Sequence, residues 1–366
     1  MALQIGIIGL PNVGKSTLFN VLTQAQNAEV ANYPFCTIEP NKALVPVPDP
    51  RLDRLAELVG VAKAVKTTIE FVDIAGLVKG ASQGEGLGNQ FLGQIRNTDA
   101  LLHVVRCFED PNVVHVSPAP DPREDIEVIE LELILADLDQ AAKKADKLSR
   151  QVKGDKQLAP ALEMAERVQS HLESGQSLRA FPERGSPGFQ ALNQELRFLT
   201  AKPVIFAANI GEEYLSDQHP DLAVIQDIAG ERGAEWVQIS AKLEADLNAL
   251  SPEEKADYMA LSGIEQTGLD LVIATCYRIL DLISFFTYNE SEARAWTVPQ
   301  GARAPQAAGR IHSDFERGFI KAEVIPFATF QQLGSTAAVK EAGKLQMEGK
   351  DYVVQDGDVI YFKFNV

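Results

Sequence analysis

Residues 9–16 read Gly-Leu-Pro-Asn-Val-Gly-Lys-Ser, a match to the pattern G-x-x-x-x-G-K-[ST]. The apolar run Leu3–Gly9 before this stretch predicts a buried strand, and apolar residues at helical spacing from Leu18 to Leu22 predict a helix after it. In that setting the glycines let backbone N–H groups face a polyphosphate, and the helix N-terminus adds a partial positive charge. We therefore expect a phosphate-binding loop rather than a plain glycine turn.

The loop also carries the side chains that phosphoryl chemistry needs. Lys15 is expected to reach the β and γ phosphates and to neutralise the charge that develops on them, which makes it a predicted catalytic residue. The Ser16 hydroxyl is expected to bind Mg²⁺, a hard ion that prefers oxygen ligands. The predicted nucleotide-binding residues of the loop are Asn12, Val13, Gly14, Lys15, Ser16 and Thr17.

Two further segments are expected to sense the γ-phosphate. The strand predicted at 67–74 ends in Asp73-Ile-Ala-Gly76, where Asp73 can support Mg²⁺ and the Gly76 N–H can touch the γ-phosphate. Thr37, in the loop before this strand, is the third predicted metal ligand, with a turn-capping role as the alternative. The glycines from 76 to 93 predict a loop that changes with the bound phosphate, and a passive surface loop is the alternative.

Strands and helices alternate along much of the chain. Further strands are predicted at 100–106, 202–209 and 235–240, with helical stretches between them. This alternation is typical of an α/β fold with a mostly parallel sheet that is covered on both faces. His103 lies inside the apolar strand at 100–106 and is expected to be a core residue.

Two regions break the alternation. From 123 to 199 no strand is predicted, and two helical runs share 4-3 apolar spacing: Leu131, Leu135, Leu138, Ala142, Ala145 and Val152, then Leu158, Leu162, Ala165 and Leu172. They predict an antiparallel coiled-coil hairpin, with an ordinary amphipathic helix pair on the core as the alternative. After a helix predicted to end near Ile283, a small α+β module is expected, with strands at 287–288, 295–298, 319–324, 351–354 and 359–364.

Composition limits the classes of partner. The 366 residues are 45% hydrophobic and 23% charged, and 51 acidic against 34 basic residues give a net charge of −17. Overall charge therefore does not favour nucleic acid, and we expect no DNA partner. Three scattered cysteines argue against a disulfide framework. Since no apolar run approaches the ~18–20 residues of a membrane helix and no signal peptide is expected, we predict a cytoplasmic protein without a membrane partner.

The base of the nucleotide is predicted from the tetrad Asn209-Ile-Gly-Glu212. In G-domain GTPases the corresponding tetrad is N-K-x-D, whose Asp accepts hydrogen bonds from guanine; here the Lys is absent and the carboxylate is one methylene longer. Adenine has an acceptor at N1, where guanine has a donor, so adenine would repel a carboxylate aimed at that atom. The departure from N-K-x-D weakens the case for GTP and makes ATP plausible. The alternative is that Glu212 swings to meet guanine. The predicted base-pocket residues are Asn209, Ile210, Glu212, Ser240, Ala241 and Lys242.

These motifs together resemble the Obg-like ATPase family, in particular its YchF subfamily, over essentially the whole chain. The resemblance rests on residues 9–16 and 32–41, on 71–92 and 106–116, on the N-x-x-E tetrad, and on 294–324. It implies a P-loop G-domain over 1–122 and 200–282, a helical hairpin over 123–199, and a ubiquitin-like (β-grasp) TGS domain over 283–366.

The resemblance also implies function. It implies Mg²⁺-dependent hydrolysis of ATP to ADP and phosphate, slow without a partner, and a regulatory association with the ribosome. His115 then matches a His that assists hydrolysis, with a plain loop residue as the alternative. Asn12 matches a P-loop Asn that helps to bind K⁺ in some relatives, and the alternative is an Asn without a K⁺ role, since P-loops also carry Asn there without K⁺. Any RNA contact must be local, and its candidate donors are basic residues of the C-terminal module, with solvated strand and loop charge as the alternative: Arg294, Arg303, Arg310, Arg317 and Lys321.

Two other functions stay open from the sequence. One is a GTPase of the same fold, which differs in the base that the tetrad reads. The other is a ribosome-binding scaffold with a static nucleotide and negligible hydrolysis. Leu77 keeps this reading open, because Ras-like proteins place a water-orienting Gln at that position.

Overall fold

The computed structural model describes residues 3–29, 41–74, 87–110, 121–214, 219–264 and 266–365. The chain divides into two compact units. The first comprises Met1–Ala28, Thr37–Val45 and Glu70–Cys276, and the second comprises Glu29–Cys36, Pro46–Ile69 and Tyr277–Val366. The predicted boundaries of the hairpin, at 122/123 and 199/200, fall inside the first unit.

The first unit is built on a six-stranded sheet in the order β2-β4-β1-β5-β6-β7. Its strands are β1 (Leu3–Ile8), β2 (Lys42–Pro46), β4 (Thr68–Asp73), β5 (Ala100–Cys107), β6 (Val204–Ile210) and β7 (Glu235–Ile239). The pairs β1–β5, β5–β6 and β6–β7 are parallel, as the sequence predicts. Every residue of β5 and of β6 is buried, so the middle of the sheet is covered on both faces.

Helices connect these strands. They are α1 (Lys15–Glu29), α3 (Leu87–Asn97), α4 (Pro122–Gln151), α5 (Ala159–Glu173), α6 (Pro187–Leu196), α7 (Pro220–Arg232), α8 (Ala241–Ala249), α9 (Pro252–Leu261) and α10 (Gly268–Ile279), with short 3₁₀ turns at Lys156–Leu158, Leu178–Ala180 and Glu212–Tyr214. Helix α4 packs on β5, and α7 packs on β6 and β7. No helix among the described residues is long and apolar enough to cross a membrane.

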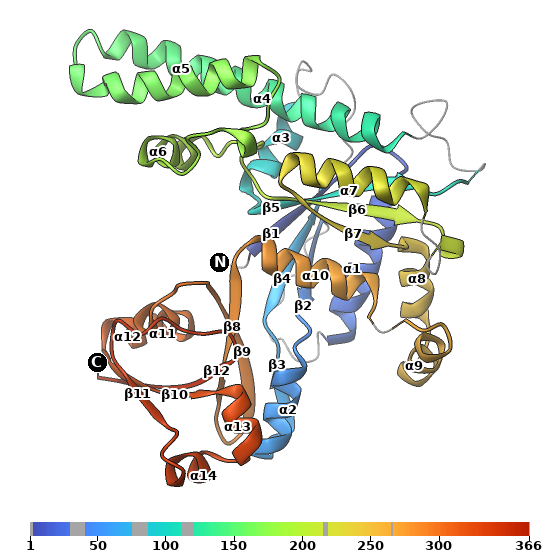
Figure 1. Cartoon of the computed structure of the whole chain (residues 1–366), viewed down its shortest axis with the longest axis vertical. Helices are drawn as coiled ribbons and strands as arrows, with labels where there is room; N and C mark the ends of the chain where they lie inside the picture. Colours follow the sequence, from blue (N-terminus) through green and yellow to red (C-terminus); the bar gives the residue numbers. More distant parts are fainter. Residues whose placement is uncertain are drawn as a thin grey trace. The chain divides into compact units, whose positions relative to one another are not determined.

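Helices α4 and α5 form the predicted hairpin and run side by side (Figure 1). Their interface has the expected 4-3 spacing, but the seam is shifted from the predicted one. Leu131 is 52% exposed, so its predicted seam position was wrong. The buried residues that form this core are Ile134, Ala141, Ala145 and Leu148 of α4, Met164, Ala165, Val168 and Leu172 of α5, and Leu178, Phe181, Phe189, Leu192 and Phe198 beyond them. The hairpin thus packs on α6 as well as on itself.

The second unit has its own six-stranded sheet, in the order β11-β10-β12-β8-β9-β3. Its elements are α2 (Pro50–Val59), β3 (Lys63–Val65), β8 (Leu282–Tyr288), β9 (Glu292–Pro299), α11 (Ala304–Ile311), α12 (Ser313–Arg317), β10 (Phe319–Pro326), α13 (Phe327–Leu333), α14 (Thr336–Glu341), β11 (Gln346–Glu348) and β12 (Asp358–Phe364). A β8–β9 hairpin, a helix, and a last strand that lies parallel to β8 make this a β-grasp arrangement.

Three sequence-based expectations differ from the structure here. Residues 46–69, expected in the nucleotide-binding domain, belong to the second unit, because β3 pairs with β9 in the register Lys63↔Glu292. The helix expected to end near Ile283 stops at Ile279, and β8 follows. The strand predicted at 351–354 is reduced to a single bridge between Arg303 and Val353, while the short strand β11 was not predicted.

Candidate functional site: a phosphate loop and its neighbours

The loop between β1 and α1 has backbone conformations that glycine favours. Gly9 has φ +147° and Gly14 has φ +103°. A Cβ at Gly9 would lie 2.4 Å from the carbonyl oxygen of Val104, and one at Gly14 would lie 2.3 Å from Nδ2 of Asn209. Backbone angle and packing therefore both require the two glycines of the predicted motif.

Lys15 is the buried cation of this loop. Its side chain is only 8% exposed, and Nζ donates to the carbonyl oxygen of Leu10 at 2.6 Å. Burial lowers the pKa of Lys15 to about 8, and the negative charge of Asp73 acts in the opposite direction. A polyphosphate would add strong negative charge beside this ammonium group, so it would favour the protonated form.

The predicted metal ligands Ser16 and Asp73 have environments that suit the role. Ser16 and Thr17 are exposed in the first turn of α1. Asp73 ends β4, and its pKa is raised by burial and lowered in part by Lys15. No group of three or more His, Cys, Asp or Glu side chains in the described part of the chain could hold a metal alone. A hydroxyl and one carboxylate instead fit Mg²⁺ that arrives with nucleotide phosphates.

Asn209 connects the phosphate loop to the segment after β7. Its Nδ2 donates to the carbonyl oxygen of Val13 at 2.9 Å, and its Oδ1 accepts from the backbone N–H of Ala241 at 2.9 Å. The side chain is 4% exposed. This amide therefore links the phosphate loop to the start of α8. Nδ2 has a second N–H, and the place of Asn209 in the base pocket stays a prediction.

Two other residues of the tetrad, Ile210 and Glu212, have different surroundings. Ile210 is 2% exposed and ends β6, so its side chain belongs to the core. Glu212 begins a 3₁₀ turn, and its Oε1 lies 3.2 Å from Nζ of Lys242 as an ion pair. That oxygen is buried and accepts no hydrogen bond, whereas the Lys242 side chain is 80% exposed. The tetrad thus presents a carboxylate that is paired with a lysine in the first turn of α8.

Ser240 and Ala241 shape the start of α8. The Ser240 hydroxyl accepts from the backbone N–H of Leu243 at 3.4 Å as the N-cap, and both residues are buried. Glu244 of the same helix accepts from the N–H groups of Gly268 and Leu269, at 2.7 and 3.3 Å, and so caps α10. These contacts fix the loop that the sequence assigns to the base.

Four residues singled out from the sequence, Thr37, Gly76, Leu77 and His115, lie outside the described residues. The prediction for His103 is confirmed, since it is 4% exposed in β5 and packs on Phe206. Burial lowers its pKa to about 3, so it stays neutral near pH 7.

Arg106 is a buried charged residue at the edge of the site, and no role was predicted for it from the sequence. It is 3% exposed near the end of β5, in register with Asn209. Its Nε donates to the carbonyl oxygen of Phe108 at 3.2 Å and its Nη2 to that of Asp110 at 3.3 Å. The guanidinium group therefore braces the chain as it leaves β5. A single charge at the end of the otherwise apolar run from 100 to 106 was the available signal.

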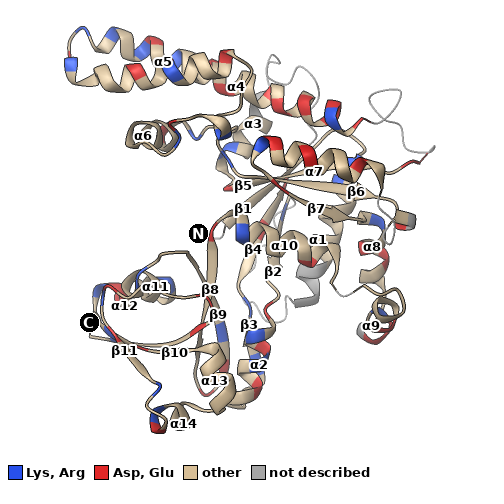
Figure 2. Cartoon of the chain, in the orientation of Figure 1, with Lys and Arg blue, Asp and Glu red and all other residues tan. Residues whose placement is uncertain are grey.

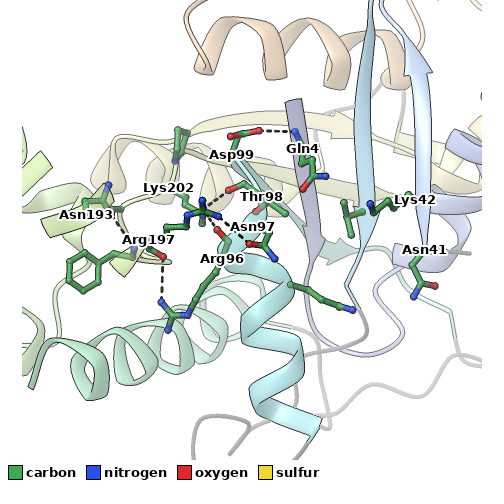
Figure 3. A pocket seen from close by; sticks show the side chains of 15 residues that line it. Gln4, Asn41, Lys42, Arg96, Asn97, Thr98, Asp99, Asn193, Arg197 and Lys202 are labelled. Carbon is green, nitrogen blue, oxygen red and sulfur yellow. Dashed lines mark hydrogen bonds between the residues drawn. The ribbon is translucent and has the colours of Figure 1, made fainter. Parts of the chain in front are cut away.

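A cavity of about 950 Å³ lies elsewhere in the first unit, near the ends of α3 and α6 (Figure 3). Its basic residues already bind protein acceptors. Nζ of Lys202 donates to the carbonyl oxygens of Arg96 and Thr98, the former at 3.1 Å. Arg96 donates to Oε1 of Gln140 at 2.7 Å, and Arg197 to Oδ1 of Asn97 at 3.2 Å. These contacts join α3 to α4, so we assign the cavity's cations a structural role.

Comparison with known proteins identifies the family. A family model described as "50S ribosome-binding GTPase" matches residues 4–150, and the model YchF-GTPase_C, described as a protein of unknown function, matches residues 282–365. The ribosome-binding ATPase YchF of Escherichia coli O157:H7 is 50% identical over 367 residues, and that of Bacillus subtilis (strain 168) is 49% identical over 371 residues. Both alignments cover 100% of each chain.

A solved structure agrees with this assignment. The structure of the Schizosaccharomyces pombe YchF GTPase superposes with a TM-score of 0.86 at 36% identity, over 99% of this chain and 97% of that chain. The printed names differ in the nucleotide, ATPase for the curated relatives and GTPase for the solved structure. They agree on the family, and with matches that span the full length of the chain, this protein belongs to the YchF family of P-loop proteins.

Proposed function

We propose that this chain is a Mg²⁺-dependent ATPase that switches state on the ribosome. The observation that carries the proposal is the phosphate loop: two obligatory glycines, a buried Lys15 and an exposed Ser16 at the start of α1. The relatives named ribosome-binding ATPase YchF support the same activity and partner. A cytoplasmic location, a regulatory role and a TGS-type second unit belong to this proposal.

The proposed chemical roles combine the surroundings of Lys15, Ser16 and Asp73 with the sequence motifs at the other positions. Lys15 neutralises charge on the β and γ phosphates, and Ser16 and Asp73, with Thr37, hold Mg²⁺. Bound there, Mg²⁺ supplies charge neutralisation for the phosphates. His115 is the proposed aid to hydrolysis, because Leu77 cannot orient water by hydrogen bonding. Hydrolysis is then slow until a partner stimulates it. Asn12, exposed at φ +63°, is the proposed K⁺ contact.

The choice of ATP over GTP rests on the ion pair between Glu212 and Lys242. A guanine that donates its N1–H and 2-amino group to the Glu212 carboxylate would have to share that carboxylate with Lys242, whose Nζ lies 3.2 Å from Oε1. Ile210 is buried in the core, so no lysine packs over the base from that position. Both features work against guanine and leave adenine as the favoured base.

Calorimetric titration of ATP and GTP against the nucleotide-free protein with Mg²⁺ tests the base. We expect ATP to bind at least tenfold tighter, about 1.4 kcal/mol. Lys242→Ala frees Glu212 and should raise the affinity for GTP relative to ATP several-fold. Lys350→Ala, at an exposed lysine of the second unit, is the matched control. Equal or tighter binding of GTP by the wild-type chain would contradict the preference for ATP and would favour a GTPase.

Phosphate release tests the chemistry, and sedimentation with ribosomes tests the switch. Lys15→Ala should abolish release of phosphate from ATP and should change the amount of protein that sediments with ribosomes. No phosphate release from the wild-type chain with ribosomes present, together with unchanged sedimentation of Lys15→Ala, would favour a static scaffold instead.

A further inference from the structure

Charge is segregated along the helical hairpin. Between residues 122 and 142 of α4 there are seven acidic residues and one basic residue. Between 143 and 156, at the far end of the hairpin, there are six basic residues and two acidic ones, a net charge of +4 in a chain of net charge −17. Figure 2 shows the Lys and Arg residues gathered at that end. We name residues 143–156 the hairpin tip.

Most of the basic side chains of the hairpin tip face solvent. Lys143 and Arg150 have side chains that are 75% and 76% exposed, each paired with an acidic residue one turn earlier on α4. Lys147, Lys153 and Lys156 are exposed, and no ion pair with another described residue involves them. Lys144 alone is mostly buried, held by Glu195 at 2.6 Å.

Three of these positions form one stripe. Residues 143, 147 and 150 follow i, i+4, i+7 spacing and so lie on one face of α4. Residues 141, 145 and 148, each two positions earlier, are buried in the hairpin core on the opposite face. At 1.5 Å of rise per residue the stripe is about 10 Å long. The packed core behind it therefore presents the cations as a preformed row.

The composition of the hairpin tip decides what kind of polyanion it fits. Residues 122–180 contain no Phe, Tyr or Trp, so the tip has no ring on which a base or a protein anchor could stack. The exposed large apolar side chains of the described residues include none between 143 and 156. The apolar faces of α4 and α5 are buried against each other in the hairpin core, so they are not available for insertion into a membrane. Cations without aromatic or apolar contacts suit a nucleic-acid backbone read by charge.

We propose that the hairpin tip binds the phosphate backbone of ribosomal RNA, without base specificity, through Lys147, Lys153, Lys156 and the paired Lys143 and Arg150. This inference rests on the proposed association with the ribosome and names the surface that makes it. The main RNA contact then lies on the hairpin of the first unit and not on the candidate basic residues of the second unit.

The test compares two triple variants of the full-length protein. Lys147→Ala/Lys153→Ala/Lys156→Ala removes three exposed cations of the hairpin tip. Lys321→Ala/Lys344→Ala/Lys350→Ala removes three exposed lysines of the second unit and is the matched control. The readouts are sedimentation with purified bacterial ribosomes and fluorescence anisotropy with a 20-base-pair RNA duplex at several salt concentrations.

We expect the hairpin variant to bind both probes at least tenfold more weakly and to release phosphate from ATP at the wild-type rate without ribosomes. The slope of log affinity against log salt should fall by about 2–3, since each lost phosphate contact removes roughly 0.9. The control variant should retain wild-type binding of both probes.

Three results would overturn the inference: unchanged ribosome binding by the hairpin variant, an equal loss in the control variant, or a ribosome-bound wild-type protein that excess RNA duplex does not displace. The last would indicate a protein partner. The wild-type chain could instead bind the duplex through the hairpin tip and fail to sediment with ribosomes. That result would contradict the proposed ribosome association and would still support RNA binding by the hairpin tip.

Discussion

Asn209 and Val13 are 196 positions apart in the sequence and are joined by a hydrogen bond of 2.9 Å from the side-chain Nδ2 of Asn209 to the carbonyl oxygen of Val13. The Oδ1 atom of the same side chain accepts from Ala241 at the start of α8. One buried amide thus sets the separation of the phosphate loop from the loop at the start of α8. A change here should alter nucleotide binding without removing any group that touches phosphate.

Asn209→Asp provides the most specific test of that relationship. The new carboxyl group keeps an acceptor for Ala241 but places a second oxygen against the carbonyl oxygen of Val13, in a site that is 4% exposed. We expect the free energy of unfolding to fall by about 1–3 kcal/mol and ATP to bind at least tenfold more weakly. Denaturant unfolding and calorimetric titration measure the two effects.

Asn193→Asp is the control for this substitution. Asn193 accepts from the backbone N–H of Phe198 at 3.0 Å through Oδ1, an acceptor role that an Asp retains. Its ATP affinity should match that of the wild-type protein. If Asn209→Asp also binds ATP with wild-type affinity, Asn209 does not position the loops.

The lowered pKa of Lys15 predicts how ATP affinity depends on pH. Phosphate contacts need the ammonium form, which predominates below a pKa of about 8. ATP affinity should therefore be nearly constant from pH 6.5 to 7.5 and should fall above pH 8 by up to about tenfold per pH unit, since protonation must then accompany binding. Titration at pH 8 in buffers of different ionisation enthalpy should detect uptake of about half a proton.

Lys15→Arg separates this effect from other titrations, because a guanidinium group stays charged across the whole range. Its weaker binding should not vary with pH between 7 and 9.5. A flat profile for the wild-type protein, with no proton uptake, would mean that Lys15 is already protonated or does not contact the phosphates.

The sequence predicted the elements that short-range patterns determine. The phosphate loop follows from eight consecutive residues, and the strands at 100–106 and 235–240 follow from local apolar runs; the structure contains all of them. The two glycines of the loop were predicted because they let backbone N–H groups face a polyphosphate. Their positive φ angles and the close approach of Gly14 to Asn209 are findings of the structure.

The contacts that the sequence did not reveal are long-range. Strand β3 has only three residues, and its partner strand β9 begins at Glu292, more than 200 positions later in the sequence. No local pattern therefore assigns residues 46–69 to the second unit. The predicted hairpin seam used Leu135 and Ala142, one position past the buried Ile134 and Ala141, and it included the exposed Leu131, because leucine and alanine fit either face of an amphipathic pattern. The structure instead buries Asp137 on α4, a residue type that hydrophobic spacing cannot select.

Asp137 ties the hairpin to the chain that enters β6. It is 0% exposed and accepts three hydrogen bonds, from the backbone N–H of Leu199 at 2.9 Å and from the N–H and Oγ1 of Thr200 at 2.8 Å each. Arg96 of α3 lies 3.8 Å from its Oδ1. Removing the carboxylate leaves three donors without an acceptor and Arg96 without its anion.

Asp137→Ala should therefore lower the free energy of unfolding by about 3–5 kcal/mol, as for other buried charged groups that lose a partner. Asp139→Ala, two positions along α4, removes a carboxylate that is 61% exposed and should cost under about 1 kcal/mol. Denaturant unfolding gives the totals, and hydrogen exchange of α4 amides shows whether the hairpin opens first. Equal costs for the two variants would mean that the contacts of Asp137 with Leu199 and Thr200 do not hold α4 in place, and that the hairpin core alone fixes the hairpin on the sheet.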